Sequence, residues 1–253
     1  MSEVLVREHE ERAAVRLVMH AGANALDLPL LEALRTVVAK HRERGAPPLL
    51  LASAHPTLFS PGWDLKRLAT ANRNEVEMVL GRFSAAVLEL FSYPGPTVAA
   101  VAGHAIAGGC LLALACDVRV MAAGPPRIGL SEVNLGVPVP ADCVRMLRAR
   151  LAPDVVSELV FRCDGLTAQR GREMGLVQRV ATPDRMAMAI EQELAAAAAR
   201  PHHAYVEAKR FLLGEAWAEM ARDAKDQRSA FVDSWFHEET LKRVRTLADR
   251  LRA

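Results

Sequence analysis

The sequence predicts an α/β fold, because apolar runs of strand length alternate with longer segments in which apolar residues recur at helical spacing. The runs at 48–52, 97–101 and 118–121 are almost continuously apolar, which is typical of strands covered on both faces. The chain has 253 residues, of which 51% are hydrophobic and 25% charged. It is therefore long enough for one large domain with a sizeable core.

The first half of the chain supplies most of the predicted strands. Two strands are expected at 4–8 and 13–19, followed by a helix with Asp27 as its N-cap and Pro29 in its first turn. The residues Gly45-Ala46-Pro47-Pro48 end that helix, and a buried strand follows at 48–52. A helix over 75–91, a strand over 97–101, a helix over 110–116 opened by Gly108-Gly109, and a strand over 118–121 complete the alternation.

From Pro153 onward the pattern predicts helices almost throughout. An alanine-rich helix end at 195–200 is closed by Pro201, and a long amphipathic pair of helices is expected over 204–252. The apolar face of that pair carries several large side chains, which are Phe211, Trp217, Phe231, Trp235, Phe236, Leu241 and Leu247. A face of that size is expected to pack against the core or against a neighbouring subunit.

Charge and composition exclude some classes of partner. The formal net charge is +2, which gives no reason to expect nucleic acid or a membrane surface as the main partner. No stretch reaches the roughly 18 apolar residues of a membrane span, and the charged N-terminal segment lacks the apolar run of a signal peptide. The four cysteines, Cys110, Cys116, Cys143 and Cys163, show no C-x-x-C spacing, so we expect reduced buried thiols and a cytoplasmic protein.

Two glycine-marked turns are candidates for binding a developing negative charge. The first is Phe59-Ser60-Pro61-Gly62-Trp63-Asp64-Leu65, after a buried strand, and the second is Gly103-His104-Ala105-Ile106-Ala107-Gly108-Gly109-Cys110, which leads into a helix. Glycine permits unusual backbone geometry, and the first N–H groups of a helix lack partners. Two such donors aimed at one point form an oxyanion hole. Either motif alone is also compatible with an ordinary tight turn, and no Lys-Ser/Thr pair follows to indicate a nucleotide P-loop.

Glu132 is the candidate base. It lies in Ile128-Gly129-Leu130-Ser131-Glu132-Val133-Asn134-Leu135-Gly136, surrounded by apolar residues. A carboxyl group in such a place is often a paired structural group. Desolvation would nevertheless raise its proton affinity toward the range that a general base needs.

These three segments, in this order and spacing, resemble the crotonase (enoyl-CoA hydratase/isomerase) superfamily over essentially the whole chain. Asn24-Ala25-Leu26 matches an early turn of that family. The resemblance implies the crotonase (ClpP-like) fold, a spiral of ββα units, in residues 1–199, and a C-terminal helical trimerisation region in residues 200–253. It also implies an acyl-CoA thioester as substrate, no separate cofactor and no metal, and a homotrimer or a dimer of trimers.

The resemblance also assigns roles to residues by position. The backbone N–H groups of Trp63 and Gly108 become the oxyanion hole, and Glu132 becomes the catalytic carboxylate. The substrate-binding positions that it implies are Ser60, Pro61, Gly62, Asp64, Leu65 and Leu111.

One departure from the family pattern decides between reactions. Hydratases of the family use a second glutamate directly after the glycine-glycine-cysteine of the second turn, and this chain has Leu111 there. The mitochondrial-type Δ3,Δ2-enoyl-CoA isomerases share this combination, with one glutamate and an apolar residue at the other position. A 1,3-proton shift needs only one carboxylate, so the sequence favours moving a double bond in fatty acid metabolism.

Two alternatives stay open at this stage. A hydratase-like lyase or an acyl-CoA hydrolase could recruit another acid such as Asp142, although an N-cap role for Asp142 in the helix 143–151 is the simpler interpretation. A catalytically silent acyl-CoA binding protein is the other, because Trp63 is bulky at the donor position and the loop after Gly136 departs from the family pattern.

Overall fold

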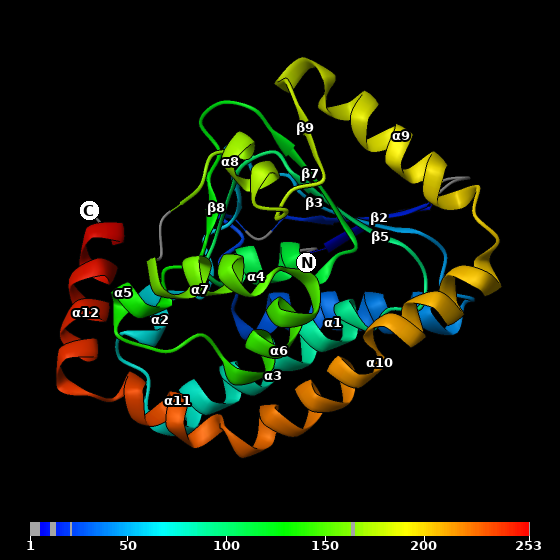
Figure 1. Cartoon of the computed structure of the whole chain (residues 1–253). Coiled ribbons are helices and arrows are strands. Elements are labelled where there is room, and N and C mark those ends of the chain that lie inside the picture. The colour runs from blue at the N-terminus through cyan, green and yellow to red at the C-terminus, as the bar shows by residue number, and fades with distance from the viewer. Residues whose placement is uncertain (1–5, 11–13, 21, 163–164, 253) are drawn as a thin grey trace.

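The computed structural model describes residues 6–10, 14–20, 22–162 and 165–252 of the chain. Its strands form two sheets, and Figure 1 shows helices gathered beneath and beside them. The strands are β1 (Val6–Glu10), β2 (Val15–Met19), β3 (Leu49–Ser53), β4 (Leu58–Ser60), β5 (Thr97–Val101), β6 (His104–Ile106), β7 (Val118–Ala122), β8 (Ile128–Gly129) and β9 (Arg179–Ala181). The α/β class predicted from the sequence is confirmed.

The larger sheet has the order β1-β2-β3-β5-β7-β9, and only the β1–β2 pair is antiparallel. Strand β5 is buried at all five positions, as its continuous apolar run predicts. The smaller sheet has three short parallel strands in the order β4-β6-β8. Its strands are only two or three residues long, too short for a periodicity to appear in the sequence.

The helices follow the strands in the expected alternation. They are α1 (Leu28–Glu43), α2 (Leu65–Leu68), α3 (Arg73–Phe91), α4 (Gly108–Ala115), α5 (Glu132–Leu135), α6 (Ala141–Arg150), α7 (Pro153–Arg162), α8 (Ala168–Glu173), α9 (Met186–Ala198), α10 (His202–Asp226), α11 (Arg228–Trp235) and α12 (Glu238–Arg252), with a short 3-10 turn at Pro183–Arg185. Asp27 caps α1 by accepting a hydrogen bond from the Leu30 N–H at 2.9 Å, as predicted.

Three predictions for the second half of the chain are wrong. The segment 204–252 is not a pair of helices but three, because the chain turns after α10 and again after α11. Strand β9 interrupts the predicted helical region. Its three residues are all half-buried, so they show neither alternation nor a buried run. The predicted cap of α6 is also wrong, since α6 begins at Ala141 and Asp142 lies inside it.

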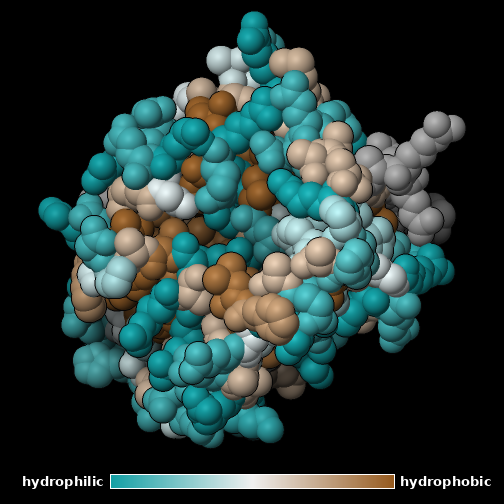
Figure 2. Space-filling view, turned by 45° about the vertical axis from the view of Figure 1, so that its right-hand side comes forward, coloured by the Kyte–Doolittle hydropathy of each residue, from teal (hydrophilic) through white to brown (hydrophobic). Residues whose placement is uncertain are grey.

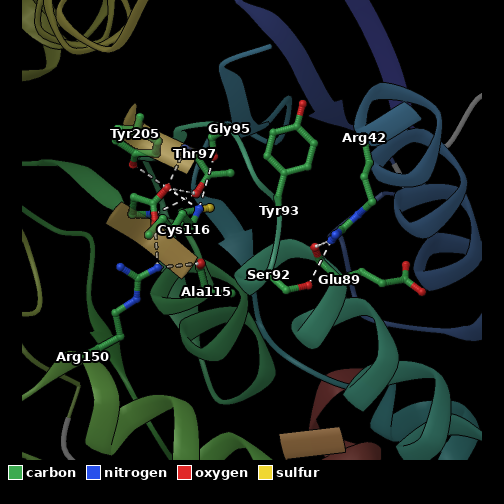
Figure 3. A network of polar contacts seen from close by, with 12 residues as sticks. Arg42, Glu89, Ser92, Tyr93, Gly95, Thr97, Ala115, Cys116, Arg150 and Tyr205 are labelled. Carbon is green, nitrogen blue, oxygen red and sulfur yellow. Dashed lines mark hydrogen bonds and ion pairs between the residues drawn. The ribbon is translucent and has the colours of Figure 1, made fainter. Parts of the chain in front are cut away.

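Helix α10 packs against the body of its own chain, where it runs across α6 and α3 (Figure 1). A buried polar network fixes it there (Figure 3). Asp117 accepts hydrogen bonds from Lys209 Nζ at 2.6 Å, from Arg150 Nη2 at 2.8 Å and from the Tyr205 hydroxyl at 2.9 Å. Burial alone would raise the pKa of Asp117, but Lys209 and Arg150 overcome that effect and hold the pKa below its usual value.

The surface is mixed in character. Figure 2 shows one face, on which hydrophilic side chains occupy most of the periphery and hydrophobic residues gather toward the middle. The most exposed large apolar side chains are Phe161 on α7 and Phe211 and Leu212 on α10, at 75%, 75% and 76%. Within the described ranges, no helix is both long and apolar enough to cross a membrane.

Candidate active site

The three predicted site residues follow the carboxyl ends of the three strands of the smaller sheet. Trp63 comes after β4, Gly108 after β6 and Glu132 after β8. These strands are parallel neighbours in the order β4-β6-β8, so their carboxyl ends lie at the same edge of the sheet. That edge is where ligands bind in parallel α/β sheets. The topology therefore explains how segments about 70 residues apart in sequence meet at one place.

The first turn presents the Trp63 N–H through the geometry of Gly62. Gly62 has a φ of +90°, a conformation that glycine adopts without steric cost. Its carbonyl accepts a hydrogen bond from the Leu26 N–H at 2.8 Å, and Leu26 pairs with Trp63 in an isolated parallel bridge. The Ser60 hydroxyl holds the turn from inside by donating to the Asn24 carbonyl at 2.7 Å. The Trp63 N–H donates to no group in the described part of the chain.

The second turn presents the Gly108 N–H at the start of α4. The preceding residue, Ala107, has a φ of +51° and a ψ of −123°, which is strained for a residue with a Cβ and is typical of functional sites. Gly108 is the first residue of α4, and its N–H also lacks a partner among the described residues. Both predicted donors thus directly follow a residue with positive φ.

The two turns touch each other. A Cβ placed on Gly62 would lie 3.1 Å from the Gly108 nitrogen and 3.0 Å from the Ala107 Cβ. A Cβ on Gly109 would lie only 2.2 Å from the Ser60 carbonyl oxygen. Only glycines at these two positions let the turns approach so closely. The close approach places Trp63 and Gly108, the residues that carry the two free N–H groups, in adjoining turns beside one cavity.

Glu132 is the first residue of α5 and only 8% exposed. Burial raises the pKa of its carboxyl group above the ordinary value, although hydrogen bonds from the backbone N–H groups of Ser131 and of Glu132 itself oppose the change. The Ser131 N–H donates to Glu132 Oε2 at 2.8 Å. No lysine or arginine contributes to this shift. A carboxylate with a raised pKa is a stronger base than an ordinary glutamate, which suits it to take up a proton from a substrate.

A cavity of about 1040 Å³ joins these features. Its lining comprises Ala23, Ala25, Leu58, Pro61, Trp63, Asp64, Leu65, Lys66, Phe83, Ile106, Ala107, Gly108, Ser131, Glu132, Asn134, Leu135, Val137, Pro140, Phe231, Trp235, Glu239, Lys242, Arg243, Thr246, Leu247, Arg250 and Leu251. Two kinds of wall stand out. Aromatic rings form one part, and the basic side chains of Lys66, Lys242, Arg243 and Arg250 form another.

The aromatic wall is built around Trp63. Its indole ring lies 5.3 Å from the ring of Phe231, 5.7 Å from Trp235 and 5.9 Å from Phe83, measured between ring centroids. The other three rings are almost fully buried, whereas Trp63 is half-buried. Trp63 is therefore the most exposed member of this aromatic cluster and also carries one of the two free N–H groups.

Not every predicted binding residue reaches the cavity. Pro61, Trp63, Asp64, Leu65, Gly108 and Glu132 line it, but Ser60, Gly62 and Leu111 do not. Ser60 and Gly62 instead determine the shape of the first turn, through the Ser60 hydrogen bond to the Asn24 carbonyl and the positive φ of Gly62. Leu111 is fully buried and packs in the main hydrophobic core. The structure therefore assigns Leu111 to packing rather than to the cavity wall.

Asp142 also lies outside the cavity lining. It is 3% exposed and sits in the first turn of α6, where its carboxyl group bonds to the Ser84 side chain. Burial raises its pKa. Its Oδ2 atom has no hydrogen-bond partner in the described part of the chain. Asp142 is therefore a buried carboxyl group that is not among the residues lining the cavity.

Sequence reasoning missed the contribution of the C-terminal helices. Phe231 and Trp235 of α11, and seven residues of α12, line the cavity. The aromatic face of this region predicted that it would pack against something, but periodicity does not say against which surface. The basic residues of α12 lie more than 170 residues from Lys66 in sequence, and no spacing rule connects them.

The cysteines and other metal-ligating side chains form no further site in the described ranges. Cys110, Cys116 and Cys143 are buried and unpaired, while Cys163 lies outside those ranges. Burial raises the pKa of all three thiols. No group of three or more His, Cys, Asp or Glu residues could hold a metal ion in this part of the chain.

Comparisons with known proteins identify the family of this chain. The family model described as enoyl-CoA hydratase/isomerase matches residues 10–248. Methylglutaconyl-CoA hydratase from mouse mitochondria is 32% identical over 68% of this chain, and that match spans 56% of the mouse enzyme. The peroxisomal enoyl-CoA delta isomerase 1 of Arabidopsis thaliana is 29% identical over 67% of this chain and 72% of its own length.

Solved structures share the whole fold. Human mitochondrial Δ3-Δ2-enoyl-CoA isomerase superposes with a TM-score of 0.88, covers 98% of both chains and is 22% identical. An enoyl-CoA hydratase from Mycobacterium ulcerans superposes with a TM-score of 0.82, covers 89% of this chain and 98% of its own, and is 25% identical. The predicted crotonase fold is thereby confirmed.

Proposed function

Because this chain belongs to the enoyl-CoA hydratase/isomerase family, we propose that it moves a double bond from the 3 to the 2 position of an enoyl-CoA. The observation that carries the proposal is a single buried carboxyl group, that of Glu132, beside two unpaired backbone donors. Of the other carboxyl groups that line the cavity, Asp64 caps α2 and Glu239 pairs with Arg243.

The two N–H groups would hold the thioester oxygen of the substrate. As a proton leaves C2, its electrons move into the carbonyl and negative charge develops on that oxygen. The donors of Trp63 and Gly108 stabilise the resulting enolate, and one donor of this kind is worth about 3–4 kcal/mol in the transition state. Their backbone attachment to two rigid turns means that little reorganisation is needed during the reaction.

Glu132 would carry the proton. Its carboxylate removes a proton from C2, the C3–C4 π electrons shift, and the protonated Glu132 returns the proton to C4 as the C2–C3 double bond forms. The reaction is a net 1,3-shift that neither adds nor removes atoms. The raised pKa of Glu132 suits both proton transfers, because the carboxylate must be basic enough to accept the proton from C2 and the carboxylic acid must be acidic enough to return it to C4.

The remainder of the cavity fits a CoA thioester. Lys66, Lys242 and Arg250 supply positive charge at one part of the wall, where phosphate groups of CoA could bind, and the aromatic wall would contact the acyl chain. We propose that CoA is part of the substrate and that no separate cofactor takes part. A homotrimer or a dimer of trimers, and a cytoplasmic location, are also proposed from the family resemblance and the sequence.

Hydration is the second candidate, because the mouse relative is named as a hydratase. That reaction usually divides the activation of water between two carboxylates. Here Leu111 stands where the family resemblance places the second glutamate, and Asp142 is not among the residues that line the cavity. A hydratase or hydrolase would thus need a second acid, and the two other carboxyl groups of the described cavity, Asp64 and Glu239, are already bonded to the start of α2 and to Arg243. A binding protein without activity is the third candidate.

One experiment separates these candidates. The pure protein is incubated with 3-hexenoyl-CoA and, in parallel, with crotonyl-CoA. We expect absorbance of the conjugated 2-enoyl product from the first and no gain of a water mass from the second. Glu132→Gln is expected to lower the isomerisation rate by about 10²–10⁴-fold. Hydration of crotonyl-CoA alone, binding without turnover, or full activity of the variant would overturn the proposal.

A further inference from the structure

The segment that carries Glu132 is too short to hold itself in place. Helix α5 has four residues, a single turn, and its N-cap Ser131 makes no side-chain capping bond. An isolated turn of helix is unstable because nucleation fixes several residues for one hydrogen bond. The position of Glu132 must therefore depend on contacts between α5 and other elements.

Helix α7 and helix α12 both contact α5, and α12, more than 100 residues later, adds two hydrogen bonds to its backbone. The Thr240 hydroxyl donates a hydrogen bond to the Gly136 carbonyl at 2.9 Å, and Arg243 Nη1 donates to the Asn134 carbonyl at 2.8 Å. Both carbonyls lie at the end of α5, where backbone acceptors lack partners within the helix. Glu239 supports Arg243 through a 2.6 Å ion pair.

The contact at Gly136 is close as well as polar. Gly136 has a φ of +103° and ends α5 in the left-handed conformation, which favours glycine. A Cβ at this position would lie 2.5 Å from Thr240 Oγ1. Thr240 is 2% exposed, so bulk solvent competes little for its hydroxyl. The Gly136 and Val137 N–H groups both return to the Glu132 carbonyl, at 3.1 and 3.0 Å, which links the Thr240 contact directly to Glu132.

Helix α12 is itself firmly held. Val244 and Ala248 are fully buried in the hydrophobic cluster that also contains Trp235 and Val137. Farther along, Arg252 Nη2 donates to the Lys66 carbonyl at 2.6 Å. Figure 1 shows α12 beside α5 and α2 at one end of the molecule. The helix therefore provides a fixed support against which α5 can be placed.

We propose that Thr240 and Arg243 are positioning residues that hold Glu132 toward the substrate through the two carbonyls of α5. The inference rests on the proposed function, in which Glu132 is the base. It goes further by making the C-terminal helix of the same chain part of the apparatus that sets the position of the base. Neither residue touches the reacting atoms.

The test is Thr240→Val, which keeps the shape of the side chain and removes the hydroxyl. We expect kcat for isomerisation to fall at least tenfold while KM changes less than threefold, because misplacing a base affects the chemical step more than binding. Thr240→Ser keeps the hydroxyl and should restore most of kcat. The matched control is Thr97→Val, since Thr97 is equally buried and its hydroxyl bonds to Asp117 far from the cavity.

Hydrogen exchange gives a readout that does not depend on activity. The amides of residues 136 and 137 should exchange faster in Thr240→Val than in the parent protein and in Thr97→Val. Unchanged exchange, an unchanged kcat, or a loss of kcat matched by Thr97→Val would overturn the positioning role. Failure of the proposed function is distinguishable, because it would appear as full activity in Glu132→Gln or as no turnover of 3-enoyl-CoA by the parent protein.

Discussion

Gly109→Ala tests the contact between the two turns that present the predicted donors. A Cβ at Gly109 would lie 2.2 Å from the Ser60 carbonyl oxygen and 2.8 Å from the Ser60 Cβ. Ordinary contacts of this kind are at least about 3.4 Å, so one turn must retreat by roughly 1 Å. Gly109 directly follows Gly108, and Ser60 lies three residues before Trp63. The displacement therefore changes the separation of the two N–H groups.

The expected result is a loss of about 10²-fold in kcat for isomerisation of 3-hexenoyl-CoA. A misplacement of 1 Å costs about that much, and so does the loss of one oxyanion donor. Overpacking should also cost about 1–3 kcal/mol of stability, so thermal unfolding must confirm that the variant is folded at the assay temperature. The measurement is kcat and KM from initial rates of conjugated product formation.

Gly214→Ala is the matched control. Gly214 lies inside α10, and an added Cβ there meets only Arg210 Cγ at 4.0 Å. Alanine is favoured over glycine in a helix by about 1 kcal/mol, so this variant should be fully active and slightly more stable. Activity of Gly109→Ala within a few-fold of the parent would refute the idea that contact between the turns sets the donor geometry.

Three further predictions follow from the charged and aromatic groups. Asp117→Asn leaves Lys209 and Arg150 without their buried counter-charge. The free energy of unfolding should therefore fall by about 3–5 kcal/mol and the Tm by about 6–20 °C. The control is Asp233→Asn, which breaks an exposed ion pair and should change stability by less than about 1 kcal/mol. Equal shifts in the two variants would contradict the role of burial. Glu132→Gln should raise the Tm at pH 8, because the folded protein then no longer buries a charge. The gain should shrink as the pH falls toward 4.5 and vanish well below it, where the carboxyl group is protonated in both the folded and the unfolded chain. A gain that persists at low pH would point to packing instead. Trp63→Leu keeps the backbone donor but removes the indole ring, which leaves more room for the acyl chain. The kcat/KM for a branched or longer 3-enoyl-CoA, divided by the kcat/KM for 3-hexenoyl-CoA, should therefore rise about tenfold. An unchanged ratio would show that the ring does not border the acyl chain.

The sequence predicts those parts of the fold that local patterns determine. Strand β5 has the predicted bounds of 97–101, because burial on both faces leaves a continuous apolar run. The Asp27 cap follows from one residue and the helix that begins after it. Strand β9 could not be found this way, since its three half-buried residues pair with β7 only through tertiary structure. The breaks between α10, α11 and α12 leave no glycine or proline to mark them.

The candidate site divides in the same way. Glycines at the two turns and a glutamate among apolar residues are local signals, and they mark three positions that the smaller sheet brings to one edge. The surroundings of a buried side chain are not a local property, so the family resemblance implies a binding role for Leu111 although it packs in the core. The bonds from Thr240 and Arg243 to backbone carbonyls of α5 join distant segments through groups that every residue carries. The residue pattern of the sequence therefore does not predict these bonds.

The most direct test of the central claim follows one proton. 3-Hexenoyl-CoA deuterated at C2 is converted in ordinary water, and the product is analysed for deuterium at C4. If Glu132 alone carries the proton from C2 to C4 inside a site where it is 8% exposed, part of the label should arrive at C4, and Glu132→Gln should form almost no product. A product with no deuterium at C4, formed at a similar rate by Glu132→Gln, would contradict the account.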